Sequence, residues 1–295
     1  MISIIICSTS KIFLQQVKIS IDSTIGINYE VLFYDNSIEQ KGICEVYNIL
    51  AAKATYPYLC FVHEDIIFNT QNWGLVIAEI FKDENIGVVG VAGCKYKSRY
   101  FSGWYSGMPE LDCENIIHQD RISGKQERIL LNNDPGKTIQ EVVCIDGVFI
   151  CTRKSIWEQI KFNENELKGF HFYDIDFSIR AGSITKMFVS YQIEIIHLTQ
   201  GGDFGDNWVL ESINWHNQHK SMLPVTLTNL NVPGADKIVI KSWLDWLKNQ
   251  SISWHNKVKW VYLQKLYLFP GLYYSLIKFF IYKPLRLKYL HRLFK

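Results

Sequence analysis

Four short apolar segments recur in the first 92 residues, and stretches with helical periodicity separate them. The apolar segments are Ile2 to Cys7, Tyr29 to Tyr34, Tyr58 to Val62 and Ile86 to Ala92. The helices expected between them are Lys11 to Asp22, Cys44 to Ala54 and Trp73 to Lys82. Strand and helix in alternation are typical of a parallel sheet with helical crossovers, as in nucleotide-binding folds. We therefore predict an α/β fold with a Rossmann-like, mostly parallel sheet flanked by helices.

The length and composition fit a folded protein with a substantial core. The chain has 295 residues, enough for one large α/β domain with an appendage or for two modest domains, and 48% are hydrophobic. There is no Cys-x-x-Cys pair, and most of the seven cysteines lie in apolar runs, at Cys7, Cys44, Cys60, Cys94, Cys113, Cys144 and Cys151. This pattern favours buried, reduced thiols in a cytosolic protein over a disulfide framework or a zinc ribbon. The N-terminal apolar run is short and lacks a basic leader, so we interpret it as the first strand.

Charge is divided unevenly along the chain. Residues 246–295 hold ten Lys or Arg and no acidic residue, whereas residues 1–245 hold 21 basic and 29 acidic residues. Such a division indicates an anionic partner for the tail alone. Nucleic acid is a poor candidate, because the acidic body would repel phosphates and no nucleic-acid-binding motif occurs.

The C-terminal part of the chain differs from the rest in composition. We divide the chain into a first domain, 1–222, and a helical, aromatic and basic region, 223–295. Trp, Tyr and Lys interleave there with Leu and Phe, which predicts helices lying on an anionic membrane surface. The apolar run Leu266 to Tyr282 contains Pro270 and Lys278, and it falls short of the roughly 20 residues that span a bilayer. A helical cap on the first domain and a homodimer contact are the alternatives.

The segment Tyr58 to Ile66 ends an apolar strand in three groups that bind metals or protons, His63, Glu64 and Asp65. Ligands of open α/β sheets bind beyond the carboxyl ends of the strands. Along an extended chain His63 and Asp65 point to one side and Glu64 to the other, so the first two could share a divalent cation. A solvated strand end is the alternative interpretation.

Beyond the fourth strand the pattern is less regular. Residues 93–140 are rich in Gly, Pro, Asn and aromatic residues, and we expect a long connection that is functional or mobile. The elements expected after it are a strand from Glu141 to Arg153 interrupted at Asp146-Gly147, a helix near Tyr173, and a strand from Met187 to Ile196 that ends at His197.

The order of several motifs resembles one known family. The motifs are ISIIICSTS, VLFYDNS, EVYNILAAKA, the His63-Glu64-Asp65 triplet, GVVGVAG, IDGVFICTR, GFHFYDIDFSIR and IIHLTQGG. Over residues 2 to 220 the chain resembles a GT-A glycosyltransferase of the family-2 type, of the branch typified by a domain of a streptomycin-biosynthesis protein. No single motif is specific, but together in this order they are.

The resemblance implies roles for particular residues. Asp65 and His197 would hold a divalent ion, Mn or Mg. The residues expected at the nucleotide sugar are Ser8, Asp35, Asn36, Asn48, His63, Glu64, Asp146 and Gly147. Two positions depart from the family pattern: His63 stands where the metal motif commonly begins with Asp, and Tyr173-Asp174 stands where many relatives have Glu-Asp. The first departure leaves the site less negative and allows weaker cation binding or a transition metal.

Asp174 is the expected general base. The resemblance implies an inverting, in-line displacement in which one carboxylate takes the acceptor proton. A helix cap is the alternative role for this side chain. Asp176 precedes Arg180 by four residues, which predicts an intrahelical ion pair with a structural role. Trp104 and His171 are candidates for acceptor contacts, with packing as the alternative.

We therefore expect a glycosyltransferase that uses a nucleotide-sugar donor and a glycan or lipid-linked acceptor, peripheral at the cytoplasmic face of the cell membrane. A sugar-nucleotide-binding or membrane-assembly module that lost turnover is the alternative, and the departures at His63 and Tyr173 favour it. A nucleotidyltransferase ranks last, because the loop after the first strand lacks the glycines such an enzyme needs.

Overall fold

The computed structural model describes residues 1–199 and 204–282. The chain forms two compact units, which interleave in sequence. Unit 1 consists of Met1–Lys97, Gly103–Gly202 and Pro224–Leu230. Unit 2 consists of Ser98–Ser102, Asp203–Leu223 and Asn231–Lys295. The helix that follows residue 204 therefore belongs to unit 2, although the sequence analysis extends the first domain to residue 222.

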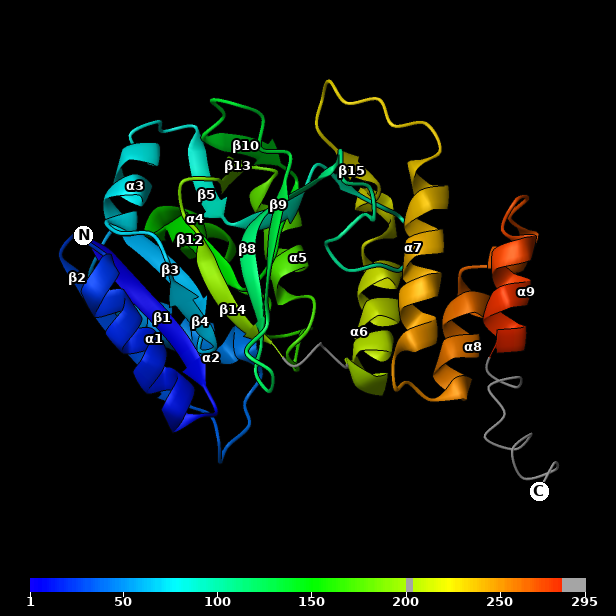
Figure 1. Cartoon of the computed structure of the whole chain (residues 1–295), viewed down its shortest axis with the longest axis horizontal. Helices are drawn as coiled ribbons and strands as arrows, with labels where there is room; N and C mark the ends of the chain where they lie inside the picture. Colours follow the sequence, from blue (N-terminus) through cyan, green and yellow to red (C-terminus); the bar gives the residue numbers. More distant parts are fainter. Residues whose placement is uncertain (200–203, 283–295) are drawn as a thin grey trace. The chain divides into compact units, whose positions relative to one another are not determined.

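A seven-stranded sheet forms the centre of unit 1, in the order β10-β13-β5-β12-β3-β1-β2 (Figure 1). Its strands are β1 (Ile2–Ser8), β2 (Tyr29–Asp35), β3 (Tyr58–His63), β5 (Ile86–Gly90), β10 (Ile139–Val142), β12 (Phe149–Arg153) and β13 (Lys186–Ser190). The strands β1, β2, β3, β5 and β13 run in one direction, and β10 and β12 run against them. The expected α/β fold with a mostly parallel sheet is confirmed, with one antiparallel strand inserted near its middle.

Helices connect the first strands as the sequence predicts. They are α1 (Lys11–Thr24), α2 (Ile43–Lys53) and α3 (Trp73–Ile80), and later in unit 1 follow α4 (Lys154–Ile160) and α5 (Tyr173–Ala181). Val17 of α1 shares a hydrophobic cluster with Ile4 of β1, whereas Ile5 points to the opposite face and is also buried. Because both faces of β1 are covered, this strand is apolar throughout most of its length.

A second sheet of six strands occupies much of the region for which a long connection was expected. Its order is β11-β6-β8-β14-β4, and β9 pairs with β8. The strands are β4 (Ile66–Phe68), β6 (Ala92–Cys94), β8 (Asp112–Asp120), β9 (Gln126–Leu131), β11 (Cys144–Ile145) and β14 (Ile195–Thr199), and a third, two-stranded sheet joins β7 (Tyr96–Lys97) to β15 (Val225–Thr226). The prediction of an irregular stretch from 93 to 140 was wrong there, because β8 and β9 stabilise each other by cross-strand pairing.

The strand expected from Met187 to Ile196 was wrong in its extent. The chain forms β13 in the seven-stranded sheet, turns at residues 191–194, and continues as β14 in the other sheet. His197 is consequently the middle residue of β14 rather than the residue after a strand. Both segments are apolar, so hydrophobicity alone did not separate them.

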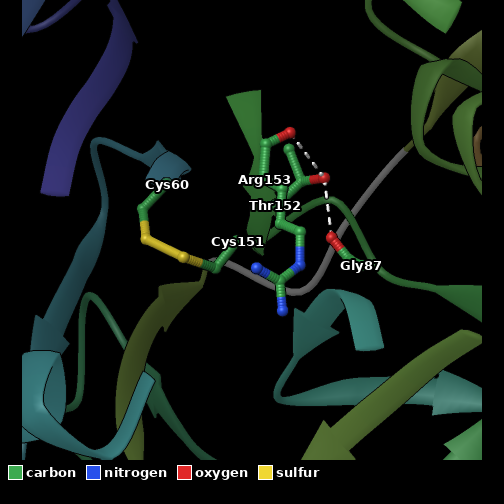
Figure 2. The surroundings of a disulfide bond; sticks show 5 residues. All are labelled: Cys60, Gly87, Cys151, Thr152 and Arg153. Carbon is green, nitrogen blue, oxygen red and sulfur yellow. Dashed lines mark hydrogen bonds between the residues drawn. A yellow bond between two sulfur atoms is a disulfide. The ribbon is translucent and has the colours of Figure 1, made fainter. Parts of the chain in front are cut away.

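Two of the seven cysteines form a disulfide, Cys60–Cys151 (Figure 2). The antiparallel pairing of β12 with β3 sets Cys151 opposite Cys60, with their Cα atoms 4.1 Å apart. The adjacent Thr152 hydroxyl donates to the Gly87 carbonyl at 2.9 Å. The expectation of reduced thiols was wrong for this pair, because strand register brings together residues that are 91 positions apart. Free thiols remain at Cys7, Cys44, Cys94, Cys113 and Cys144.

Unit 2 is helical. Its elements are α6 (Gly205–Gln218), the short 3-10 helix η1 (Lys220–Met222), α7 (Ala235–Asn249), α8 (Trp254–Leu263), the 3-10 helix η2 (Leu266–Leu268) and α9 (Tyr273–Tyr282). The helices α6 and α7 pack through aromatic rings, with Trp208 and Trp243 stacked at 5.0 Å between centroids. Lys257 is fully buried, and its ammonium donates to the Gln250 carbonyl at 2.6 Å, so one basic residue of the tail is internal. Among residues 1–199 and 204–282, no helix is both long and apolar enough to cross a bilayer.

Candidate functional site

The carboxyl ends of three neighbouring strands lie at one edge of the large sheet. The register sets Ser8 at the end of β1 beside Asp35 at the end of β2, and it sets Cys7 beside His63 at the end of β3. This is the edge at which open α/β sheets bind ligands. The expectation that the predicted site residues gather at strand ends is confirmed for these positions.

His63, Asp65 and His197 form a cluster of three metal-ligating side chains. Their ligand atoms all lie within 4.8 Å of one another. The Nδ1 atom of His63 is 3.9 Å from one carboxylate oxygen of Asp65, and Nε2 of His197 is 3.6 Å from the other. The expectation that His63 and Asp65 point to the same side is confirmed. Pairing of β14 with β4 positions His197, because it sets His197 opposite Ile66, next to Asp65.

Asp65 is held in its charged form. Burial raises its pKa, but the His197 hydrogen bond and the charges of His63, His197 and Arg121 lower it to about 2. The Arg121 guanidinium lies 2.5 Å from Asp65, and its Nε donates to the Leu198 carbonyl at 2.6 Å. The sequence analysis missed Arg121, which directly follows β8 in the stretch expected to be irregular. Nothing in the local sequence around Arg121 predicts its contact with Asp65.

Glu64 points away from the cluster, as expected from the alternation of side chains. Its carboxylate accepts hydrogen bonds from the Ser8 hydroxyl at 2.5 Å and from the backbone N–H groups of Thr9 and Ser10. Ser10 in turn caps the N-terminus of α1. In the structure, Glu64 and Ser8 thus fix the loop between β1 and α1.

Asp35, Asn36 and Asn48 make local contacts in the structure. The Asp35 carboxylate accepts hydrogen bonds from the backbone N–H and the hydroxyl of Ser37. These bonds form an Asx-type turn, as the local sequence indicates. Asn36 exchanges two hydrogen bonds with the backbone of Lys41. The Asn48 amide binds the loop after α4, with bonds to both the N–H and the carbonyl of Phe162. Their expected contact with a nucleotide sugar stays a prediction.

Asp146 and Asp174 form a pair of neighbouring carboxylates. Gly147 N–H donates to Asp174 at 3.1 Å, and Val148 N–H donates to Asp146 at 2.7 Å. Burial, and next the charge of Asp146, raise the pKa of Asp174 to about 7, although the N–H groups of Ile175 and Gly147 lower it. Asp174 therefore exchanges its proton near neutral pH, as a general base needs to do.

The start of α5 carries local strain beside this pair. Phe172 adopts φ 64°, a left-handed conformation that a bulky residue rarely takes. It directly precedes Tyr173, whose hydroxyl lies 2.7 Å from Nε2 of His63. Such strain persists where the surrounding structure enforces it, commonly at functional sites. Further along α5, the expected ion pair between Asp176 and Arg180 is confirmed at 2.7 Å.

The two candidates for acceptor contacts lie in different settings. Trp104 is partly buried and packs against the main hydrophobic cluster of unit 1. His171 lies two residues before Tyr173, and burial lowers its pKa to about 4, so its imidazole is neutral at physiological pH. Their contact with an acceptor stays a prediction.

Asp65, His197 and Asp174 thus belong to one connected cluster, although they lie far apart in the sequence. Asp65 neighbours both histidines, His63 bonds Tyr173, and the Tyr173 hydroxyl donates to the Gly147 carbonyl at 3.0 Å. Gly147 then bonds Asp174. Three side chains that could hold a metal ion are therefore linked, through Tyr173 and Gly147, to an aspartate with a pKa near neutral pH.

The comparison with family models decides the class of protein. Residues 3–210 match the model described as a glycosyltransferase-like family. The chain belongs to this glycosyltransferase family. The match covers all of the residues of the connected cluster.

Other known proteins are similar to this glycosyltransferase at low identity. The streptomycin biosynthesis protein StrF of Streptomyces griseus is 22% identical over 209 residues, which are 66% of this chain and 69% of StrF. The structure of S. aureus TarS 1–349 in complex with UDP is 12% identical, with a TM-score of 0.48 over 88% of this chain and 78% of that one. The structure of GalNAc-T7 with UDP, GalNAc and Mn²⁺ is 13% identical, with a TM-score of 0.48 over 74% of this chain and 49% of that one.

Proposed function

We propose that this glycosyltransferase moves a sugar from a nucleotide-sugar donor to a glycan or lipid-linked acceptor by a metal-dependent, inverting reaction. The observation that carries the proposal is the connected cluster at the carboxyl edge of the sheet. It joins a metal-ligating triad to a carboxylate that exchanges its proton near pH 7. Transfer needs one group to stabilise the leaving diphosphate and another to deprotonate the acceptor, and this cluster offers both.

The triad suits a divalent cation. The ligand atoms of the three side chains lie within 4.8 Å of one another, and the two imidazoles approach the two carboxylate oxygens of Asp65 to 3.9 and 3.6 Å, close enough to gather around one ion. Asp65 contributes a full negative charge, because its pKa is lowered to about 2. A cation bound there supplies Lewis-acid stabilisation of the diphosphate leaving group. Arg121 stands against the same carboxylate and is positioned to add a second positive charge next to the phosphates.

Asp174 acts as the general base in this proposal. Its two oxygens accept N–H groups of Ile175 and Gly147, which orient the carboxylate. Burial, and next the charge of Asp146, keep its proton affinity high enough to remove the proton of an acceptor hydroxyl. Asp146 has one carboxylate oxygen bonded to Val148 and is the candidate for binding sugar hydroxyls.

Donor turnover and donor binding together test the proposal. We expect release of free sugar from nucleotide sugars with added Mn²⁺ or Mg²⁺, and none after chelation by EDTA. A thermal-shift screen of nucleotide sugars, with and without the ion, identifies the donor, because a ligand stabilises only the folded state that binds it. Stabilisation by a donor without any hydrolysis or transfer would favour the alternative of a sugar-nucleotide-binding module.

The membrane part of the proposal rests on unit 2. The segment formed by α8, η2 and α9 exposes large apolar side chains, of which Tyr262, Leu268 and Tyr274 are 63%, 63% and 70% exposed. Aromatic residues interleaved with lysines favour the headgroup region of an anionic bilayer. Five of the ten basic residues of the tail lie at 283–295, outside the described residues. The proposal places the protein at the cytoplasmic face of the membrane, where a lipid-linked acceptor would also lie.

Vesicle sedimentation of the full chain tests this part. Replacing Leu268 and Tyr274 together by Glu should release most of the protein from phosphatidylserine vesicles. The matched control is Ile122→Glu, which changes an 87% exposed apolar residue in unit 1 and should leave sedimentation unchanged. Full sedimentation of the double variant would contradict a membrane role for these residues.

A further inference from the structure

The two positions at which this chain departs from the family pattern contact each other. His63 ends β3 and Tyr173 begins α5, and they are 110 positions apart in the sequence. Nε2 of His63 lies 2.7 Å from the Tyr173 hydroxyl. His63 and Tyr173 therefore form one hydrogen-bonded unit.

The direction of this hydrogen bond follows from counting protons. A tyrosine hydroxyl has one proton, and a backbone carbonyl can only accept. Tyr173 donates its proton to the Gly147 carbonyl at 3.0 Å. Tyr47 also hydrogen-bonds Tyr173. If Tyr173 donated its proton to Tyr47 rather than to Gly147, the His63 nitrogen would still have to donate to Tyr173. Both contacts of the Tyr173 hydroxyl are hydrogen bonds only when Nε2 of His63 carries a proton and donates it to Tyr173.

This tautomer determines what His63 presents to the metal-ligating triad. A neutral imidazole with its proton on Nε2 has its lone pair on Nδ1. Nδ1 is the atom that lies 3.9 Å from the Asp65 carboxylate, too far for a hydrogen bond. A lone pair and a carboxylate face each other there, and a cation between them satisfies both.

Gly147 is required for this arrangement. A β-carbon at this position would collide with the hydroxyl oxygen and the ring of Tyr173. Its carbonyl accepts the Tyr173 proton, and its N–H donates to Asp174. The absence of a side chain thus lets the tyrosine reach both His63 and the backbone.

We propose that Tyr173 is a positioning residue that fixes the His63 tautomer and makes Nδ1 of His63 the third ligand beside Asp65 and His197. The proposal rests on the metal dependence stated under the proposed function and adds the class of ion. Two imidazole nitrogens and one carboxylate favour a transition ion such as Mn²⁺, Co²⁺ or Zn²⁺ over Mg²⁺, which prefers oxygen ligands. Hydrogen-bonding partners of metal ligands typically contribute about 10- to 100-fold in affinity.

The tautomer is measured first, in the metal-free protein. Long-range ¹H–¹⁵N NMR of ¹⁵N-histidine-labelled protein distinguishes a protonated from an unprotonated ring nitrogen, and His63→Gln identifies the signal. We expect the proton of His63 on Nε2 in the wild type and a mixture of tautomers in Tyr173→Phe. A proton on Nδ1 in the wild type would overturn the proposal whatever the activity of the enzyme.

Metal affinity is measured second, without nucleotide, by Mn²⁺ electron paramagnetic resonance and by calorimetry with Zn²⁺ and Mg²⁺. We expect the wild type to bind Mn²⁺ and Zn²⁺ at least about tenfold more tightly than Mg²⁺, and Tyr173→Phe to lose about tenfold in Mn²⁺ affinity. The matched control is Tyr191→Phe, which removes a partly buried hydroxyl bonded to the Leu131 carbonyl and should change neither value. Equal binding of Mg²⁺ and Mn²⁺ would overturn the class of ion.

Two further variants keep the outcomes separable. In a His63→Asp background, in which a carboxylate replaces the imidazole, Tyr173→Phe should have no further effect on Mn²⁺ binding. Gly147→Ala should mimic Tyr173→Phe, and its melting curve shows whether it folds. Unchanged Mn²⁺ affinity in a folded Tyr173→Phe protein overturns this inference alone. A wild type that binds no divalent ion overturns the metal dependence in the proposed function, and with it the ligand role of His63.

Discussion

Asp65 and Asp174 are the same side chain in two opposite environments of one cluster. At the end of β3, the His197 hydrogen bond and the charges of His63, His197 and Arg121 hold the pKa of Asp65 at about 2. At the start of α5, burial and the charge of Asp146 raise the pKa of Asp174 to about 7. Their surroundings thus keep one carboxylate charged and let the other exchange a proton near neutral pH. The difference comes from deeper burial and a negative neighbour at Asp174, and from a hydrogen bond and positive neighbours at Asp65.

The largest expected effect comes from removing the proton acceptor. Asp174→Asn should lower sugar transfer by about 10³-fold, because loss of a general base typically costs 10²- to 10⁴-fold. Donor affinity, measured by thermal shift, should stay the same, since Asp65 and its neighbours are intact. A variant with near-normal turnover would exclude Asp174 from the mechanism.

Asp65→Asn should remove the negative charge that the proposed metal site depends on. We expect Mn²⁺ affinity to fall by at least about 100-fold, because the only carboxylate of the triad loses its charge. Mn²⁺ electron paramagnetic resonance without nucleotide measures this loss. Asp134→Asn is the control, since it neutralises an exposed aspartate whose pKa is also lowered, there by hydrogen bonding to Lys137. Retained affinity would place the ion elsewhere.

Asp146→Asn should make the environment of Asp174 more like that of an ordinary carboxyl group. Transfer by the wild type should rise with pH through about 7, as Asp174 loses its proton. Without the charge of Asp146, the rising limb should move to lower pH by about one unit, which is roughly tenfold in activity on the acidic side. A rising limb that stays in place would show that burial alone sets the pKa.

The pH dependence of wild-type stability provides an independent check that the pKa of Asp174 is raised in the folded state. Between about pH 4 and pH 7 the folded state keeps a proton on Asp174 that the unfolded chain has lost. The contribution of this group to the free energy of unfolding should therefore decrease as pH rises through this range. Asp174→Asn should remove that decrease, as urea unfolding at a series of pH values would reveal.

The smallest effect is expected from Arg121, the cation that faces Asp65. Arg121→Gln should raise Mn²⁺ affinity roughly fivefold, about 1 kcal/mol, because a positive charge no longer repels the ion. Calorimetric titration measures it. Arg128→Gln is the matched control: it removes a largely exposed arginine of neighbouring β9 that pairs with Glu194, and it should not change Mn²⁺ affinity. Weaker binding in Arg121→Gln would instead mean that the guanidinium orients the carboxylate.

Local periodicity predicted the elements of the first 92 residues well. The helix expected from Lys11 to Asp22 ends at Thr24, and the strand expected to end at Val62 includes His63. The opposite directions of Asp65 and Glu64 also followed from the two-residue period of a strand. These features depend on neighbours in sequence, which a single chain displays directly.

Pairing between strands was outside what periodicity predicts. The pairing of β8 with β9, the division of β13 from β14 and the Cys60–Cys151 bond depend on register between segments. Arg121 reaches Asp65 only because β8 pairs with β14, and no local pattern marks it. Strand pairing depends on which register buries the apolar faces of the whole sheet, and the residues of one strand do not determine it.

The sequence by itself determined an α/β chain with polar residues at the ends of its strands, because alternation and apolar runs specify strands, helices and their exposed ends. Only the tertiary structure decided which of those residues act together. It joined His63 to Tyr173 across 110 positions and set an arginine beside one aspartate and a second carboxylate beside the other. Charge and hydrogen bonding act over a few ångströms in space, so the chemistry of each aspartate depends on neighbours that folding brings to it.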